Sequence, residues 1–490
     1  MREVALILLA VAALAAPSFC LPFRGDEASY LTAAEALTHG RALYRDTWDV
    51  TNPGVFAWYA LAGTLFGFTE DGVRLLDLLW QAGFALTLSA AVRRAYALPR
   101  LPVAPGVLVA GVYFLAGYST AGHLARAEGL AVFPLFVAVY GVAVGGRRWL
   151  LAAGMAAGAV ALLKLMLAGV VVAAGLVLLV TAVRGRRPVL GPTAWLLVGL
   201  AVPVGAAVGY FAAHGTLGEA GWTLFVAPRQ MMAEVPPAGL DRLLTSLKWF
   251  AGVFAGPAAA AVVGVSGRWP ARDPFLPAWL AALTAAGAVV LVQRLSWWPY
   301  HGMLPGGMLA VLAGYTLPAV RAACDGLRLP RRVEVVAVVA GLAPLMLAGG
   351  VATVHAAGHR FGLTAADRVA ARLSYGTTYR EAAAEAEWLA APGRKPGAIL
   401  VGGDPLVHRF SGRRPAVRAL GRSLELWPAA VRAGVEADVR GRRPAYVFLS
   451  RPYGYVQLVA DRYPGLAAQL ASDYRPVRDT WYGVWYERID

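Results

Sequence analysis

The residues best suited to chemistry lie in a polar stretch, Pro22 to Pro53, which carries five acidic side chains: Asp26, Glu27, Glu35, Asp46 and Asp49. Asp26 and Glu27 open a predicted helix, Asp26–His39. Neighbouring helical side chains point about 100° apart, so only one of the two can face a given substrate atom. A carboxylate here suits a general base or an oxygen ligand for a divalent cation. Asp26 could instead cap the helix by accepting backbone N–H bonds, and position alone favours that role.

Further charged and aromatic residues interrupt the apolar segments that follow. Arg126 and Glu128 precede one such segment, where an exposed ion pair contributes little to stability. Lys164 lies between two apolar runs. Inserting a Lys at the bilayer centre costs about 2.5–3.5 kcal/mol, and a Lys whose ammonium reaches the headgroups costs far less. The sequence favours neither position for Lys164. Tyr300 and His301 follow two tryptophans in S-W-W-P-Y-H, and such aromatics are typical of the headgroup belt.

The composition indicates the setting of these residues. Of the 490 residues, 58% are hydrophobic and only 15% are charged, with a mean hydropathy of +0.56, whereas a soluble domain carries about 25% charged residues. Apolar runs of roughly 20 residues recur, long enough to cross a membrane core of about 30 Å. The net charge of +16 comes mainly from Arg, and most of the Arg residues in the first 354 positions lie in the short gaps between these runs. This pattern indicates orientation in a membrane and attraction to anionic lipids, not nucleic-acid binding.

The apolar runs predict a polytopic, mainly α-helical protein with about eleven transmembrane helices. The predicted spans are Val4–Leu21, Val73–Val92, Leu101–Tyr118, Gly129–Val144, Trp149–Leu163, Leu165–Val183, Trp195–Ala213, Leu244–Val265, Phe275–Val292, Met303–Val320 and Val333–Val354. Pro53–Gly67 is apolar but too short for a comfortable span, so we expect it to lie in the interface. Every Arg cluster between spans then falls on the cytoplasmic side, as the positive-inside rule requires.

This topology divides the chain into two predicted domains. Residues 1–354 form a transmembrane module whose first extracytoplasmic loop is 22–72. Residues 355–490 form a small extracytoplasmic α/β domain, because alternating and helical patterns rich in charge begin at His355. We expect a helix at Ala365–Leu389 and strands at Ala398–Val401, Tyr446–Leu449 and Trp485–Glu487.

One motif extends beyond these general features. The stretch D-E-A-S-Y-L-T-A-A-E-A-L-T-H-G-R-A-L-Y-R-D-T-W-D-V-T-N-P-G is followed by an aromatic apolar piece and by V-R-L-L-D. It resembles membrane glycosyltransferases of the GT-C class, in particular the bacterial PMT/ArnT-like group of families 39 and 83. The shared pattern is an acidic pair after the first span, a Tyr four residues on, a Gly-x-x-x-Tyr, a Pro-containing turn and an Arg opening the next span. The resemblance covers most of the chain, and G-A-I-L-V-G-G-D-P-L-V-H-R-F-S-G-R-R-P is similar to the outer domain of the group.

The resemblance implies roles for particular residues. The first acid of the pair, Asp26, takes the position of the proposed catalytic base, which reverses the preference for a cap. Glu27, the second acid of the pair, is the other expected catalytic residue. Tyr30 and Arg74 match the Tyr and the span-opening Arg and are expected to bind substrate. Asn52-Pro53-Gly54 departs from the Lys-Pro-Pro of many ArnT-like members, whose Lys contacts the donor phosphate, so a cation must come from elsewhere or the donor differs.

Four candidates could supply or support that phosphate site: Arg126 with Glu128, Lys164, the Tyr300-His301 pair and, ranked lowest, the loop His214–Arg242 with Arg229, Gln230 and Glu234. Cations near a leaving phosphate stabilise the charge that develops on it. A second acidic motif in the loop of Glu128 and a Tyr-His motif near the donor phosphate occur in related enzymes. Glu128 could therefore bind the donor or a divalent metal, and no cofactor other than such a cation is expected.

The predicted activity is that of an inverting glycosyltransferase in the cytoplasmic (inner) membrane, with its site and C-terminal domain outside. The expected donor is a polyprenyl-phosphate-linked sugar, and the acceptor is a glycan, a lipid or a protein. The sequence has no Walker A loop, H-E-x-x-H, or D-x-D of nucleotide-sugar enzymes, which argues against a nucleotide donor. A polysaccharide polymerase or ligase and a lipid-linked glycan transporter are the alternatives; the transporter would be expected to show inverted repeats, and the sequence has none.

Overall fold

The structure, a computed structural model, describes residues 1–119, 124–186, 188–266, 273–293, 295–326, 331–420 and 423–489. The chain forms two compact units, each built from segments far apart in the sequence. The membrane unit comprises Met1–Leu21, Val73–Ala207 and Ala238–Arg368, and the mixed unit comprises Pro22–Gly72, Val208–Pro237 and Val369–Asp490. The predicted boundary at residue 354 separates a membrane-spanning part from an extracytoplasmic part. The two compact units are defined by packing alone, so they do not test that boundary.

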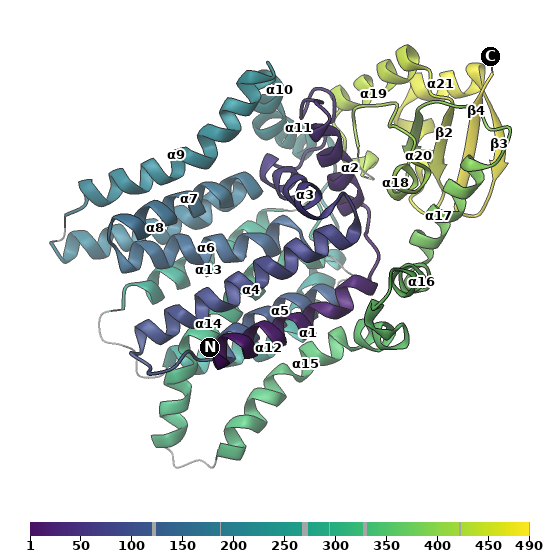
Figure 1. The fold of residues 1–490 in the computed structure, drawn as a ribbon. Coiled ribbons are helices and arrows are strands. Elements are labelled where there is room, and N and C mark those ends of the chain that lie inside the picture. Colours follow the sequence, from purple (N-terminus) through teal and green to yellow (C-terminus); the bar gives the residue numbers. More distant parts are fainter. Residues whose placement is uncertain are drawn as a thin grey trace. The chain divides into compact units, whose positions relative to one another are not determined.

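The membrane unit is a bundle of long apolar helices. They are α1 (Arg2–Ala15), α4 (Glu70–Ala95), α5 (Ala104–Ser119), α6 (Ala127–Val144), α7 (Arg147–Leu163), α8 (Ala168–Arg184), α9 (Leu190–Ala213), α12 (Leu240–Ser266), α13 (Phe275–Val292), α14 (Met303–Gly326) and α15 (Arg331–Gly358). Figure 1 shows α4, α6, α7, α8 and α13 running roughly along one direction. Each predicted span overlaps one of these helices, although Val4–Leu21 extends past the end of α1 into a 3-10 turn, Ala16–Cys20.

The protein is a multi-pass membrane protein. Among the described residues, eight helices are long and apolar enough to cross a membrane, and Ala104–Ser119 and Ala343–Gly358 are shorter apolar helices. The count of eleven crossings therefore stays a prediction. α3 (Pro53–Phe66) has 14 residues, which at 1.5 Å per residue falls well short of a core of about 30 Å, as its sequence predicted.

Small residues bring neighbouring helices of the bundle into backbone contact. A Cβ added to Gly154 of α7 would lie 2.1 Å from the carbonyl oxygen of Leu196, and one added to Gly199 of α9 would lie 2.3 Å from that of Leu151. Helix association in lipid depends on such packing, because burying apolar surface gives no gain where the solvent is itself apolar. A larger side chain at either glycine would force α7 and α9 apart.

An aromatic cluster marks one end of the bundle. Tyr96, which follows α4, packs against Tyr315 of α14, and Tyr315 packs at a tilt against Phe275 at the start of α13. Tyr140, late in α6, also packs against Phe275. Because α6 ends here and α13 begins here, the start of α6 and the end of α13 lie at the opposite end. Arg126 and Gln293 are found there.

The mixed unit combines short helices with one small sheet. Its helices are α2 (Asp26–Thr38), α3, α10 (Leu217–Gly221), α11 (Ala227–Glu234), α16 (Ala365–Tyr375), α17 (Thr377–Ala390), α18 (Leu406–Ser411), α19 (Ala429–Arg442), α20 (Tyr455–Arg462) and α21 (Pro464–Asp473). Its strands are β1 (Ile399–Gly402), β2 (Tyr446–Ser450), β3 (Tyr474–Asp479) and β4 (Gly483–Arg488). The order is β1-β2-β4-β3, with β1 parallel to β2 and the other pairs antiparallel.

The secondary structure differs from the prediction in two places. The single helix predicted over Ala365–Leu389 is wrong, because Gly376 adopts an extended conformation and separates α16 from α17. β3 was not predicted: its sequence Y-R-P-V-R-D is charged and contains a Pro, and it lies at the edge of the sheet with mostly exposed side chains. Edge strands tolerate such residues, so they lack the apolar pattern that identifies a central strand.

Trp48 joins the three segments of the mixed unit. Its indole Nε1 donates to the Thr223 hydroxyl (3.1 Å), its backbone N–H donates to the Arg418 carbonyl (2.6 Å), and its carbonyl accepts from the N–H of Leu420 (2.9 Å). Its ring also meets that of Trp427 edge to face. The first polar loop is therefore bound into the α/β domain by backbone bonds, which fixes α2 as part of this unit.

We expect the mixed unit to lose stability as pH falls from about 6.5 to 4, through His408. Burial lowers the pKa of this imidazole to about 4, whereas the unfolded chain titrates near 6.5. The unfolded state binds the extra proton in this window, so stability present above pH 6.5 falls by about 3 kcal/mol by pH 4. Thermal unfolding of the full chain followed by Trp fluorescence measures this, and His408→Gln should flatten that part of the pH dependence. An unchanged slope in the variant would contradict it.

Candidate functional site

The residues predicted to hold a phosphate gather at one end of the membrane unit. Lys164, in extended conformation between α7 and α8, places its Nζ 2.5 Å from Glu128 Oε1 and 2.5 Å from Gln293 Oε1. His301 Nε2 lies 3.9 Å from the same Glu128 oxygen. Glu128 and His301 are 5% and 3% exposed, and the Lys164 side chain retains 20% of its exposure. Lys164 thus lies at the break between the two predicted spans, and its ammonium is paired with a carboxylate.

Arg126 and Tyr300 flank this cluster in sequence. Arg126 precedes α6, is 4% exposed, and places its guanidinium carbon 4.5 Å from the centroid of the Tyr300 ring. The Tyr300 ring in turn lies edge-on to that of His301. Stacking on an aromatic face holds a guanidinium in a fixed orientation. The exposed Arg126–Glu128 ion pair considered from the sequence is not what the structure shows, since both side chains are buried.

Arg74 lies on a buried polar strip of α4. Arg74, Asp77 and Gln81 recur at helical spacing and are all at most 1% exposed. The hydroxyl of Tyr113 donates to Asp77 Oδ1 (2.7 Å) and accepts the N–H of Ala125 (2.9 Å). This strip therefore fixes the backbone immediately before Arg126.

The acidic pair opens α2 in the mixed unit. Gly25, with a φ of 30°, occupies the N-cap position, and Asp26 is the first helical residue and partly exposed. The carboxylate of Glu27 is buried and accepts the N–H of Arg24 (3.1 Å). The two acids thus differ in setting: Glu27 supports the start of the helix from inside, and Asp26 retains access to solvent.

Tyr30 anchors α2 against α3. Its ring packs edge to face on Phe56 and Tyr59, and its hydroxyl lies 3.3 Å from the Thr51 hydroxyl, which donates to it. Tyr30 is 9% exposed. These contacts fix the orientation of α2, on which Asp26 lies one turn earlier.

The structure brings together two groups of predicted residues. Arg126, Glu128, Lys164, Tyr300 and His301 form one group in the membrane unit, and Asp26, Glu27 and Tyr30 share α2 of the mixed unit. The sequence analysis did not single out Gln293 or Asp77. Asp77 lies inside an apolar run and Gln293 directly follows one, and a polar residue at such a position could have identified both. Within the described ranges, no group of three or more His, Cys, Asp or Glu side chains has a metal-binding arrangement. The divalent cation stays a prediction.

Comparison with solved structures identifies the fold. Two structures of ArnT from Cupriavidus metallidurans, one bound to undecaprenyl phosphate and one in the apo state, each align with 100% of this chain. The alignments cover 97% and 99% of the ArnT chains, with a TM-score of 0.59 and 17% sequence identity in both cases. No family model matches the chain, and no match was found among curated proteins. This chain therefore has the fold of ArnT, as the sequence resemblance predicted.

Proposed function

We propose that this protein is an inverting glycosyltransferase that moves a sugar from a polyprenyl-phosphate donor to a glycan, lipid or protein acceptor. The reaction takes place at the outer face of the cytoplasmic membrane, with residues 355–490 on that side. Asp26 is the general base, and the cluster around Lys164 receives the donor phosphate. A GT-C fold by itself does not define a reaction, so the proposal depends on the chemistry of these residues.

The observation that carries the proposal is the contact of the partly exposed Lys164 with the buried Glu128, beside the buried His301, in a chain with the ArnT fold. One ArnT structure contains undecaprenyl phosphate, so this fold can accommodate a lipid phosphate. A buried ion pair is weak evidence for a stabilising role, because desolvation offsets the attraction between the charges. Cations held at a partly open position are what a leaving phosphate requires.

In the proposed reaction, Asp26 accepts the proton of an acceptor hydroxyl as its oxygen attacks the anomeric carbon of the donor sugar. The bond between that carbon and the phosphate oxygen breaks, and its electron pair stays on the phosphate. Lys164, Arg126 and His301 stabilise the resulting charge, and one displacement inverts the anomeric configuration. Lys164 supplies the cation that Asn52-Pro53-Gly54 lacks relative to Lys-Pro-Pro.

The remaining residues position these groups. Glu128 and Gln293 orient the Lys164 ammonium, and Tyr300 orients the Arg126 guanidinium. Glu27 and Tyr30 hold α2 so that Asp26 keeps one orientation. Arg74, on the strip that holds the Arg126 loop, acts in donor binding.

Transfer by the purified full chain in liposomes tests the proposal. The probe is a synthetic polyprenyl-phosphate hexose of known anomeric configuration, and the readout is polyprenyl phosphate released when acceptor glycans are added. Release together with an inverted linkage in the NMR spectrum of the product is expected. A polymerase or ligase would require a diphosphate-linked glycan instead, and a transporter would move the donor across the liposome with no bond broken; either result would contradict the proposal.

A further inference from the structure

A basic cavity lies within the mixed unit, on residues that the proposed reaction does not use. It has a volume of about 430 Å³ and is bounded by the second half of α2, the loop that follows it, and residues 408–420 of the α/β domain. Five arginines line it: Arg41, Arg409, Arg413, Arg414 and Arg418. Thr32, His39 and His408 add polar groups, and Glu35 and Asp46 are the acidic residues in its wall.

The two acidic residues already have cationic partners. Glu35 forms an ion pair with Arg409, which also donates to the Phe68 carbonyl (2.5 Å). Asp46 accepts two hydrogen bonds, both 3.0 Å, from Arg45, a residue that does not line the cavity. It accepts a third from the N–H of Ala42. The bond to Arg45 holds the pKa of Asp46 below its usual range, and the charge of Arg41 is the smallest of the causes. The carboxylates therefore leave most of the arginine charge in the cavity uncompensated.

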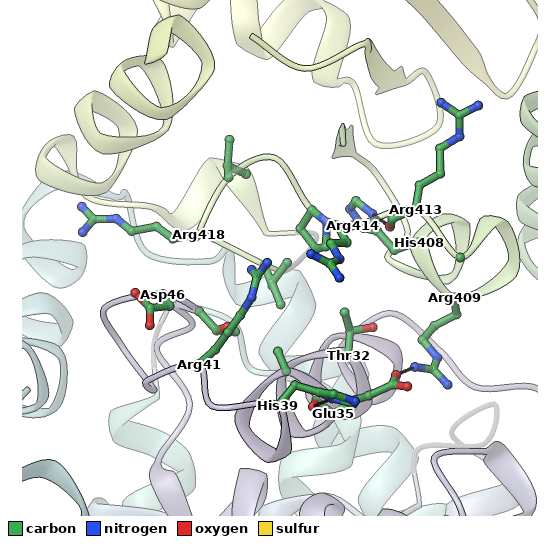
Figure 2. A pocket seen from close by; sticks show the side chains of 16 residues that line it. Thr32, Glu35, His39, Arg41, Asp46, His408, Arg409, Arg413, Arg414 and Arg418 are labelled. Carbon is green, nitrogen blue, oxygen red and sulfur yellow. Dashed lines mark hydrogen bonds and ion pairs between the residues drawn. The ribbon is translucent and has the colours of Figure 1, made fainter. Parts of the chain in front are cut away.

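The arginines divide into structural and open groups. Arg413 donates to the carbonyls of Lys395 (2.6 Å) and Leu389 (2.9 Å), which binds the loop to the sheet domain. Arg41, Arg414 and Arg418 make no side-chain hydrogen bond or ion pair with any residue that the structure describes. Figure 2 shows the guanidinium groups of Arg41 and Arg414 pointing toward one another, whereas those of Arg413 and Arg418 point away. Two cations from separate segments thus face one space.

This arrangement selects a ligand class. Like charges that face each other without a counter-ion repel, so the cavity favours an anion between Arg41 and Arg414. Guanidinium groups bind phosphate and carboxylate in forked pairs, and a phosphate has three terminal oxygens with which to accept from two sides at once. Thr32 and His39 offer hydroxyl and imidazole groups to sugar hydroxyls. The volume of about 430 Å³ lies within the usual range of small-ligand sites, about 300–1,000 Å³.

We infer that this cavity is a binding site for the phosphate group of a phosphorylated oligosaccharide. That the ligand is the acceptor of the transfer rests on the proposed function. The cavity is lined in part by the helix that Asp26 opens: its wall includes residues of α2 from Thr32 onward and His39, which follows the helix. At 1.5 Å per residue these positions lie about 9 to 20 Å from Asp26 along the helix axis. An acceptor held here by its phosphate must span that separation to bring a hydroxyl to Asp26, which favours an oligosaccharide over a single phosphorylated sugar.

Binding of glucose 1-phosphate, measured by calorimetry on the full chain in phosphatidylcholine nanodiscs, tests the inference. Arg41→Gln and Arg414→Gln should each weaken binding by about tenfold or more, since each removes a charge-assisted hydrogen bond. The double variant should lose about a hundredfold if the two contacts add. Arg440→Gln is the matched control: it removes one exposed positive charge from α19, outside the cavity, and should change binding less than about twofold.

Three results would overturn the inference. Glucose could bind as tightly as glucose 1-phosphate, Arg440→Gln could weaken binding as much as Arg41→Gln, or the wild-type chain could fail to bind the probe. Vesicles containing phosphatidylglycerol separate the two sources of phosphate: competition by them would assign the site to lipid headgroups instead of saccharides. This experiment measures binding and not transfer. Unaltered binding in the arginine variants would therefore refute the phosphate site in the cavity and leave the proposed function intact.

Discussion

Asp26→Asn is expected to lower the rate of sugar transfer by about 10²–10⁴-fold, the usual contribution of a general base. An amide keeps the size and the hydrogen-bonding groups of the carboxylate and cannot accept the proton of the acceptor hydroxyl. Asp26 is partly exposed at the start of α2, so its replacement removes little packing. The melting temperature of the variant should therefore stay close to that of the wild type. The measurement is initial transfer rate in liposomes at saturating donor.

Two further variants test whether Asp26 acts in catalysis or only in packing. Asp26→Glu keeps a base and should recover part of the rate, whereas a residue needed only for packing would not be rescued by a longer side chain. Glu27→Gln should act mainly on stability, because Glu27 is buried and accepts the N–H of Arg24. Full transfer by Asp26→Asn would remove the base from the proposed mechanism.

Lys164→Gln is expected to destabilise the membrane unit by about 3–5 kcal/mol, because it leaves the buried carboxylate of Glu128 without its cation. Transfer should also be lost, since the variant removes the charge proposed to stabilise the leaving phosphate. Loss of transfer in the single variant could result from unfolding or from the missing charge, so activity alone does not distinguish them. Thermal unfolding and transfer rate must both be measured.

The double variant Lys164→Gln with Glu128→Gln separates the two effects. Two facing amides at the 2.5 Å contact now occupied by Lys164 and Glu128 can bond to one another, and removing both charges of a buried pair is often neutral for stability. The melting temperature should return toward that of the wild type while transfer stays absent. Recovery of transfer along with stability would mean that the pair only holds α6 against α7.

Much of the membrane unit could be predicted because its signals are local. An apolar run long enough to cross the bilayer must form a helix, since lipid offers no partner to an open backbone. Each predicted span accordingly overlaps a helix. Gly376 and β3 were missed for the opposite reason: the break between α16 and α17 and the pairing of a charged edge strand depend on packing against the rest of the domain.

The sequence could identify the residues of the candidate site, but it could not predict which of them are in contact. A Lys or His inside apolar sequence is costly unless paired, which is why Lys164 and His301 could be singled out. Their partners could not be: Glu128, Gln293 and Lys164 are separated by up to 165 residues in the chain. They meet at one point only because the start of α6 packs beside the ends of α7 and α13. The cavity shared by Arg41 and Arg414 could not be predicted either, because the two arginines come from distant segments of the chain.

The sequence by itself determined that this is a multi-pass membrane protein, which segments are its helices and which polar residues are candidates for chemistry, because burial in lipid constrains each segment separately. Only the tertiary structure decided which of these residues meet, that Glu128 and Gln293 hold Lys164, and that a cavity with two facing arginines lies beside α2. Contacts between segments distant in the chain depend on how helices and loops pack, and no local pattern of residues encodes that packing.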